Sequence, residues 1–426
     1  MADGFGAEVR RRREHLGMSL RELARRAPLD AGHLSRLEAG RRQPTREAAI
    51  ALDAALHAGG DLVALAAAPP LPWPLTADGW GRRDAEALAN ALTTITPTVD
   101  NAARLAQEWL ITEPPQLYEM RAGRRIGVAT VDRVERRVHQ LRRLDDHAGG
   151  ATTYTLVSAE LAATANLLRT ASYTEPVARR LLTVLGELTQ LAGFVAADIG
   201  RTAEATRLYV AGMRAAHAAG DRAGAANNLG SLAYHVANTG DPREAPLLAR
   251  TAAAGAAHHR SATAVALQWE RVAWAHARAG DDRAAGRALA TVEDTYGRRH
   301  PDDDPPWAYW LTPDEVDVMA GRVWTQLQRP LRAVPILQRA VASYGADTGR
   351  ETALYLTWLA EALLQAREVE QAVDVATRAL RLASRAGSAR AVERVAVIRG
   401  QLADYAGTPA VDAFEDECQS HDPTGA

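Results

Sequence analysis

Small residues recur at a nearly constant spacing through the second half of the 426-residue chain. Gly200, Gly240 and Gly280 are evenly spaced, and each is followed five positions later by an alanine. The alanine position continues beyond them at almost the same period, in the series Ala205, Ala245, Ala285, Ala333 and Ala372, with one longer step between the third and fourth members. A fixed period of helix pairs separated by small-residue turns is typical of a solenoid, in which each repeat packs on its neighbours. The spacing predicts an α-solenoid over residues 151–426, with capping helices at its C-terminal end.

The residue composition favours helices and excludes several classes of enzyme. Alanine, leucine and arginine dominate, and aromatic residues make up only 5% of the chain, a balance that favours helix over sheet. The sequence contains no lysine, which excludes phosphate-binding loops of the GxxxxGK[ST] type, lysine Schiff bases and the kinase lysine. The HExxH and GxSxG motifs are also absent. We expect an all-α protein that is not an enzyme and needs no cofactor.

The cysteine and histidine content argues against disulfides and metal sites. A single cysteine, Cys418, cannot form an internal disulfide or a cysteine metal cluster, and such sparse use is consistent with a reducing compartment. His258 and His259 lack further ligands at a useful spacing, so no metal site is expected. The sequence has no run of eighteen apolar residues and no signal-peptide segment. We therefore expect a cytoplasmic protein.

Charge is distributed unevenly along the chain. Residues 1–46 hold eleven arginines and six acidic residues, a balance of +5, whereas the whole chain has a net charge of -2. A small basic module on an acidic body suggests a head that binds a polyanion and a body that repels it. A solvated arginine face is the alternative interpretation, and charge alone does not decide between them.

The segment 1–68 shows four short helical patterns with N-terminal caps. Ser19 followed by Glu22 forms a capping box, Asp30 precedes the third pattern, and Thr45 precedes the fourth. Short polar or Pro/Gly breaks separate the patterns. The segment is therefore expected to form a compact helical bundle.

The stretch LGMSLRELARRAPLDAGHLSRLEAGRRQPT, from Leu16 to Thr45, resembles the helix-turn-helix of phage-repressor-like (XRE-type) DNA-binding domains. It carries a Leu-x-x-Leu-Ala core in helix two and a Ser-x-x-Glu-x-Gly segment at the end of helix three. The resemblance covers residues 1–68 and implies a five-helix domain whose third helix enters the major groove. Pro28 stands in the turn where family members usually have glycine. Because the proline ring holds φ at roughly −65°, a left-handed turn is not expected there.

By the same resemblance, four residues of the third helix face base edges: Ala31, Gly32, His33 and Arg36. His33 and Arg36 are the two with reach, and a bidentate contact from Arg36 to guanine is worth about 1–3 kcal/mol of discrimination. The residues placed for phosphate contacts are Ser19, Ser35, Arg41, Arg42 and Thr45. Glu38 is expected to fix the turn rather than to contact DNA. One head covers only a short half-site, so a homodimer on double-stranded operator DNA is expected.

Two segments separate the head from the solenoid. Residues 69–81 are rich in proline and glycine and suit a semi-rigid extended linker, in which Trp73 and Trp80 are expected to pin the linker to the body. Residues 82–150 show helical patterns and form a predicted connector. Its end, LRRLDDHAGG (Leu141 to Gly150), resembles a segment of actinobacterial-type regulators that join such a head to a helical repeat body.

The small-residue pattern of the body resembles tetratricopeptide repeats. In each unit a glycine or alanine on the first helix precedes the turn, and the second helix carries the alanine named above. The period of about 40 residues exceeds the usual length of about 34, so HEAT-like pairing stays open. The additional residues between the third and fourth units fall in Gly297 to Pro313, a predicted surface loop, whose aspartates at 302–304 are expected to be solvated rather than to bind a cation.

An aromatic residue precedes each regular glycine turn by six positions, at Phe194, Tyr234 and Trp274. On a helical wheel Tyr234 lies about 150° from the centre of the aliphatic arc, and polar residues occupy the neighbouring turns. In tetratricopeptide proteins this face lines a concave surface that takes peptides or small molecules. The predicted ligand-binding residues are Gln190, Phe194, Asp198, Asn227, Tyr234, Asn238, Glu270, Trp274, Arg278, Arg322 and Gln326. The alternative is that the rings pack on the neighbouring repeat.

The sequence thus predicts a cytoplasmic, homodimeric transcriptional regulator. Its head would bind operator DNA, and its tetratricopeptide-like body would bind a peptide, small-molecule or protein effector. The alternative is a scaffold or adaptor protein with weak or auxiliary DNA binding, which would co-purify with a partner and give no operator footprint.

Overall fold

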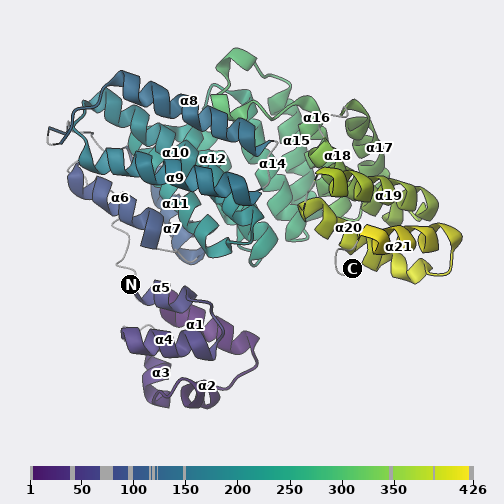
Figure 1. Cartoon of the computed structure of the whole chain (residues 1–426), viewed down its shortest axis with the longest axis horizontal. Helices are drawn as coiled ribbons and strands as arrows, with labels where there is room; N and C mark the ends of the chain where they lie inside the picture. Colours follow the sequence, from purple (N-terminus) through teal and green to yellow (C-terminus); the bar gives the residue numbers. More distant parts are fainter. Residues whose placement is uncertain are drawn as a thin grey trace. The chain divides into compact units, whose positions relative to one another are not determined.

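A computed structural model of the chain describes residues 3–38, 44–67, 80–94, 99–114, 117, 120–121, 123–146, 150–344, 349–386 and 389–421. Across these residues the regular elements are α-helices, α1 to α21, with short 3-10 turns and three isolated β-bridges but no strand (Figure 1). The all-α prediction is confirmed, and consecutive helix pairs form an α-solenoid after the N-terminal helices. Contacts divide the chain into two compact units, Met1–Val138 with Tyr154–Val236, and His139–Thr153 with Ala237–Ala426.

Five helices make up the head: α1 Asp3–His15, α2 Leu20–Arg26, α3 Ala31–Glu38, α4 Arg46–Ala55 and α5 Asp61–Ala67. The predicted caps are confirmed. Ser19 Oγ accepts from the Glu22 amide at 3.2 Å, an Asp30 carboxylate oxygen accepts from the His33 amide at 2.8 Å, and Thr45 Oγ1 accepts from the Ala48 amide at 3.1 Å. Each cap satisfies an amide that has no partner within its own helix.

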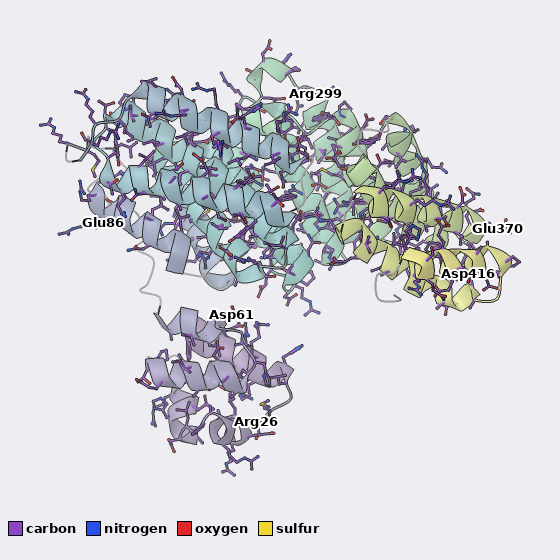
Figure 2. The ribbon with its side chains drawn as sticks, viewed as in Figure 1. Arg26, Asp61, Glu86, Arg299, Glu370 and Asp416 are labelled. Carbon is purple, nitrogen blue, oxygen red and sulfur yellow. The ribbon has the colours of Figure 1, made fainter. Side chains whose placement is uncertain are left out.

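The head has its own hydrophobic core. Its buried members come from all five helices and the turns between them, among them Phe5, Val9, Leu23, Leu34, Leu37, Leu52 and Leu62. Gly6 allows α1 to cross α3 closely, because a Cβ at this position would lie 2.0 Å from the Leu37 carbonyl oxygen. In Figure 2, Arg26 at the end of α2 and Asp61 at the start of α5 mark opposite ends of the domain.

The turn between α2 and α3 differs from the expectation for Pro28. Its φ is 25°, on the left-handed side that the ring disfavours. The Leu29 amide donates to the Ala24 carbonyl at 2.8 Å, which closes the end of α2 around this residue. The turn therefore has the positive φ that glycine normally adopts at this position, and the backbone of Pro28 is strained as a result.

Four helices lie between the head and the first repeat: α6 Arg82–Thr94, α7 Val99–Ile111, α8 Val128–Asp145 and α9 Gly150–Thr170. Most of the predicted linker, including Trp73, lies outside the described residues. Trp80 is only 1% exposed and forms a backbone bridge with Leu117, as expected for a residue that pins the chain to the body.

Helix pairs then follow the period of the small residues. The helices follow one another as α10 Glu175–Asp198, α11 Thr202–Ala219, α12 Arg222–Thr239, α13 Ala245–Ala256, α14 Ala262–Arg278, α15 Asp282–Tyr296, α16 Pro313–Gln326, α17 Pro330–Ser343, α18 Gly349–Gln365, α19 Val369–Ala386, α20 Ala389–Leu402 and α21 Pro409–His421. Consecutive helices that pack as pairs include α10 with α11, α14 with α15, α16 with α17, and α18 with α19. The alanine after each turn is completely buried in all five units in which the sequence placed it. The small-residue series therefore marks the core of the repeats.

The small position on the first helix of a pair faces the second helix of the same pair. A Cβ at Gly193 would lie 2.7 Å from the Tyr209 ring, and a Cβ at Gly321 would lie 2.5 Å from the Leu337 side chain. Close approach of the two helices therefore depends on these small residues, as in other repeats built from helix pairs.

The segment from Gly297 to Pro313 is not a simple surface loop. Trp307 and Leu311 are 2% and 5% exposed, and the Tyr309 hydroxyl donates to the Asp146 carboxylate at 2.8 Å. The Asp304 carboxylate accepts from Ser261 Oγ and Thr263 Oγ1 at 2.6 and 2.8 Å. The segment is thus anchored to the body through its second half, whereas residues 297–302 are exposed as the sequence predicts.

Among the described residues one helix, α10, is long and apolar enough to cross a membrane, but 72% of its apolar window is buried inside the structure. This is the pattern of a core helix. No group of three or more His, Cys, Asp or Glu side chains suited to a metal ion occurs in the described part of the chain.

Candidate DNA-binding and ligand-binding sites

Helix α3 presents a polar face outward while it anchors itself through leucines. Leu34 and Leu37 are 0% and 1% exposed and belong to the head core. Gly32, Ser35 and Arg36 are exposed on the other side of the helix, and Ala31 is half-buried. The predicted base-facing and phosphate-facing residues of this helix therefore share one accessible surface, apart from His33.

The two long side chains of this face differ in availability. A guanidinium nitrogen of Arg36 lies 3.5 Å from where a Cβ of Gly32 would stand, so the Arg36 side chain runs back along the exposed face of the helix. His33 Nε2 is buried and makes no hydrogen bond to the described residues. The side chain of Arg36 is exposed, whereas the Nε2 atom of His33 is covered by its surroundings.

Two of the predicted phosphate contacts are helix caps. Ser19 and Thr45 stand at the first turns of α2 and α4, and each side-chain oxygen accepts from an amide of its own helix. A hydroxyl that accepts in this way still carries a proton that it can donate to a phosphate oxygen. Arg41 and Arg42 lie outside the described residues.

A buried ion pair holds α3 against α1. Arg13 Nε and Nη2 donate to the two carboxylate oxygens of Glu38 at 2.7 and 2.9 Å, and Arg13 Nη1 donates to the Met18 carbonyl at 3.0 Å. The side chains of Arg13 and Glu38 are 12% and 6% exposed. The expected structural role of Glu38 matches this geometry, but its partner was missed because Arg13 is one of four consecutive arginines and nothing local distinguishes it.

A family model described as a helix-turn-helix domain matches residues 5–66. The match begins in α1 and ends in α5, so it spans the five helices of the head. Residues 5–66 are a helix-turn-helix domain. None of the curated proteins compared with the chain matches it.

Several of the predicted ligand-binding residues lie on α10 and α12. Phe194 and Tyr234 are half-buried, and Asn227 is 7% exposed. Gln190 Nε2 donates to Ser231 Oγ at 3.2 Å and thereby links the first helices of two consecutive repeats. Phe194 and Tyr234 therefore keep an accessible part, together with the half-buried Gln190 and Asp198.

Trp274, the third ring of the series, packs between repeats. It is 3% exposed, its ring centroid lies 5.8 Å from that of Trp358 in an edge-on arrangement, and its Nε1 donates to Asn238 Oδ1 at 3.2 Å. The Arg322 guanidinium lies 4.8 Å from the Trp274 ring and 5.1 Å from the Trp358 ring. For Trp274 the packing alternative describes the geometry, and Trp358 is a member of the cluster that the sequence reasoning missed.

Polar residues at the ends of α14 and α18 reach back to the preceding repeat. Arg278 Nε donates to the Ala237 carbonyl at 3.0 Å, and Gln365 Nε2 donates to the Thr325 carbonyl at 3.1 Å. Arg278 and Gln365 each stand seven positions before the buried alanine of their repeat. Arg278 Nη1 also donates to Gln326 Oε1 at 3.2 Å. This repeated bond caps the last carbonyls of one helix with a side chain of the next, and the constant offset from the alanine was the signal that could have revealed it.

Two acidic side chains, the buried Glu270 and the half-buried Glu315, lie on α14 and α16. Glu270 is 4% exposed, and burial raises its pKa, although Arg271 and Arg322 oppose that shift. Glu315 accepts from the hydroxyls of Tyr344 and Tyr355, each at 2.6 Å, and burial raises its pKa as well. Charged and aromatic groups are therefore concentrated on α14, α16 and α18.

Glu270→Gln is expected to stabilise the repeat domain at neutral pH, because burial raises the pKa of this carboxyl and thereby disfavours its charged form relative to the neutral one. The pKa of Glu270 is higher in the folded protein than in the unfolded chain, so protonated Glu270 stabilises the wild-type fold fully only below the unfolded-state pKa. This stabilisation is lost as pH rises through the folded-state pKa. The stability advantage of Glu270→Gln should therefore grow with pH.

Urea unfolding of both proteins, followed by tryptophan fluorescence at several pH values from mildly acidic to neutral, measures this difference. Asp302→Asn, on an exposed carboxylate, is the control and should show no such growth. A constant or shrinking difference for Glu270→Gln would contradict the prediction.

Proposed function

We propose that the protein is a cytoplasmic, sequence-specific DNA-binding transcriptional regulator. The observation that carries the proposal is the helix-turn-helix domain at residues 5–66, whose helix α3 leaves Gly32, Ser35 and Arg36 exposed. An α-helix with such a face fits the major groove, and its N-terminal residues meet the base edges. The role assigned to the chain is binding, not catalysis.

Arg36→Ala is expected to weaken operator binding by about 1–3 kcal/mol, or roughly 5- to 150-fold, because the guanidinium is the one exposed long side chain of the described reading face. The loss should fall on the selected site and much less on an unrelated duplex. Duplexes selected from a random library, followed by fluorescence anisotropy with both kinds of DNA, provide the measurement.

Arg10→Ala is the matched control. Arg10 is an exposed arginine of α1, paired with Glu14 at 2.9 Å, so its removal changes the head charge equally without touching α3. Arg10→Ala should weaken binding to the selected duplex and to the unrelated duplex equally. An unchanged preference in Arg36→Ala, or the absence of any DNA binding by the wild type at low salt, would count against the proposal.

The repeat domain is proposed to bind an effector and to support a homodimer. Phe194 and Tyr234 are half-buried, and Gln190 and Asp198 stand one helical turn on either side of Phe194. These residues support an effector surface on α10 and α12 that combines aromatic and polar groups. The effector class stays a peptide, a small molecule or a protein. Titration of fractionated cell extract into the protein–operator complex tests this part, since an effector shifts the equilibrium only by its differential affinity for the two states.

A further inference from the structure

The segment from Met120 to Leu144 is at least as basic as residues 1–46. It contains eight arginines and two acidic residues, a net charge of +6 in a chain whose total is -2. Most of these residues belong to α8, which lies along the outer edge of the helices it packs with in Figure 1. The acidic remainder of the body had suggested repulsion of nucleic acid, and this segment departs from that average.

Helix α8 buries one stripe and exposes arginines on the opposite side. Val131, Val134 and Val138 are buried at helical spacing, whereas Arg133 and Arg136 are exposed and make no ion pair within the described residues. This exposed arginine surface, together with Arg124 and Arg125 just before the helix, is named the α8 basic face.

The acidic residues of this segment are already neutralised from another helix. Arg180 of α10 donates to Glu135 at 2.6 and 3.0 Å and to Asp132 at 2.6 Å. Glu135 and Asp132 in turn raise the pKa of Arg180. The charge of the α8 basic face is therefore not cancelled by its own acidic neighbours.

The loop that carries Arg124 and Arg125 is held in place by backbone bonds. Ser172 N donates to the Arg124 carbonyl and Ile126 N donates to the Ser172 carbonyl, both at 2.9 Å. Gly123 has a φ of 107°, and a Cβ there would lie 1.9 Å from the Thr170 carbonyl oxygen, so the close crossing requires glycine. The two arginines of the loop are thus presented from an ordered backbone.

We propose that the α8 basic face is a second, sequence-independent contact for the DNA phosphate backbone. The inference rests on the proposed function, because DNA is the polyanion that the helix-turn-helix domain would bring near. Exposed guanidinium groups suit phosphate oxygens and release counterions when they bind. The fourteen residues between α5 and α6 span at most about 50 Å, so both surfaces can engage one DNA duplex.

The test compares the salt dependence of DNA binding in full-length proteins. The double variant Arg133→Gln with Arg136→Gln should lower the slope of log affinity against log salt by up to about 1.8, since each lost phosphate contact removes about 0.9. The loss should be equal for the selected duplex and an unrelated duplex, because phosphate contacts carry no sequence information. The selected duplex should extend about 20 bp beyond the site on each side, because each base pair adds about 3.4 Å and the linker reaches at most about 50 Å.

A charge-matched control separates a specific surface from net charge. Arg283→Gln with Arg378→Gln removes two arginines from α15 and α19, and it should leave the slope within experimental error of wild type. A slope in the α8 variant equal to that of wild type or of the control overturns the inference while leaving the proposed function intact. If the wild-type protein binds no DNA, the proposed function itself is wrong.

Binding to RNA or to anionic vesicles distinguishes other polyanions. If the α8 variant loses binding to single-stranded RNA or to phosphatidylserine vesicles and keeps the wild-type slope on DNA, the surface serves that partner and the inference is wrong. With wild-type protein, a duplex whose flanks are truncated should give the same lowered salt slope as the α8 variant gives on the long duplex. The reason is that the flanking phosphates are the predicted partner of the α8 basic face.

Discussion

Glu38→Ala is expected to destabilise the helix-turn-helix domain by about 3 kcal/mol, the largest single effect in the head, because removal of one member of a nearly buried ion pair costs about 3–5 kcal/mol in general. Glu38 is 6% exposed on its side chain and bonds bidentately to Arg13. Its loss leaves the Arg13 guanidinium charged and poorly solvated. The residual exposure of Arg13 places this pair at the low end of the range.

Hydrogen exchange of head amides in the full-length protein measures the loss, since exchange reports the opening of this domain alone. Glu14→Ala is the control, because Glu14 is 54% exposed and pairs at the surface with Arg10 at 2.9 Å and more distantly with Arg13 at 3.5 Å; surface pairs contribute about 0–1 kcal/mol. Equal protection in Glu38→Ala and Glu14→Ala would show that the pair does not hold α3. A double-mutant cycle with Arg13→Ala isolates the pair energy.

Gly6→Ala is expected to destabilise the same domain by about 2–3 kcal/mol, even though alanine is the better helix former. The added Cβ would stand 2.0 Å from the Leu37 carbonyl oxygen and 3.0 Å from that of Glu38. Neither contact is with a flexible side chain, so α1 and α3 must move apart, and such overpacking typically costs about 1–3 kcal/mol. Displacement of α3 should also weaken operator binding.

Gly400→Ala supplies the matched control. Gly400 lies within α20, and a Cβ there meets nothing within 4 Å. The same substitution should therefore stabilise its helix by about 0.5–1 kcal/mol through helix propensity alone. Head amides that are equally protected in Gly6→Ala and wild type would mean that the α1–α3 crossing is not as close as the structure places it.

Local sequence signals identified the elements of the head. Ser19, Asp30 and Thr45 act on amides a few positions away, so their capping roles can be recognised in a short window. The leucines of α3 follow helical spacing and are buried as that spacing requires. The turn at Pro28 is the local exception, because packing of α2 and α3 overrides the preference of a single residue.

The surroundings of individual residues in the body were harder to predict than its architecture. The buried alanines recur because every repeat must bring its own two helices together, and that demand repeats with the chain. The partners of Trp274 and Arg278 belong to other repeats that are distant in sequence. A helical wheel places such residues on a face, but it contains no information on what a neighbouring helix puts against that face.

The all-α class, the period of the solenoid, the caps of the head and the helix-turn-helix resemblance could be read from local sequence, because each depends on residues close in the chain or on a repeated spacing. The pairing of Arg13 with Glu38, the packing of Trp274 between repeats and the neutralisation of the acidic residues of α8 by Arg180 became evident only in the folded chain. These three outcomes depend on charge and surface contributed by distant helices. Burial and electrostatic pairing are properties of such assembled neighbours, so they appear only once the helices are packed.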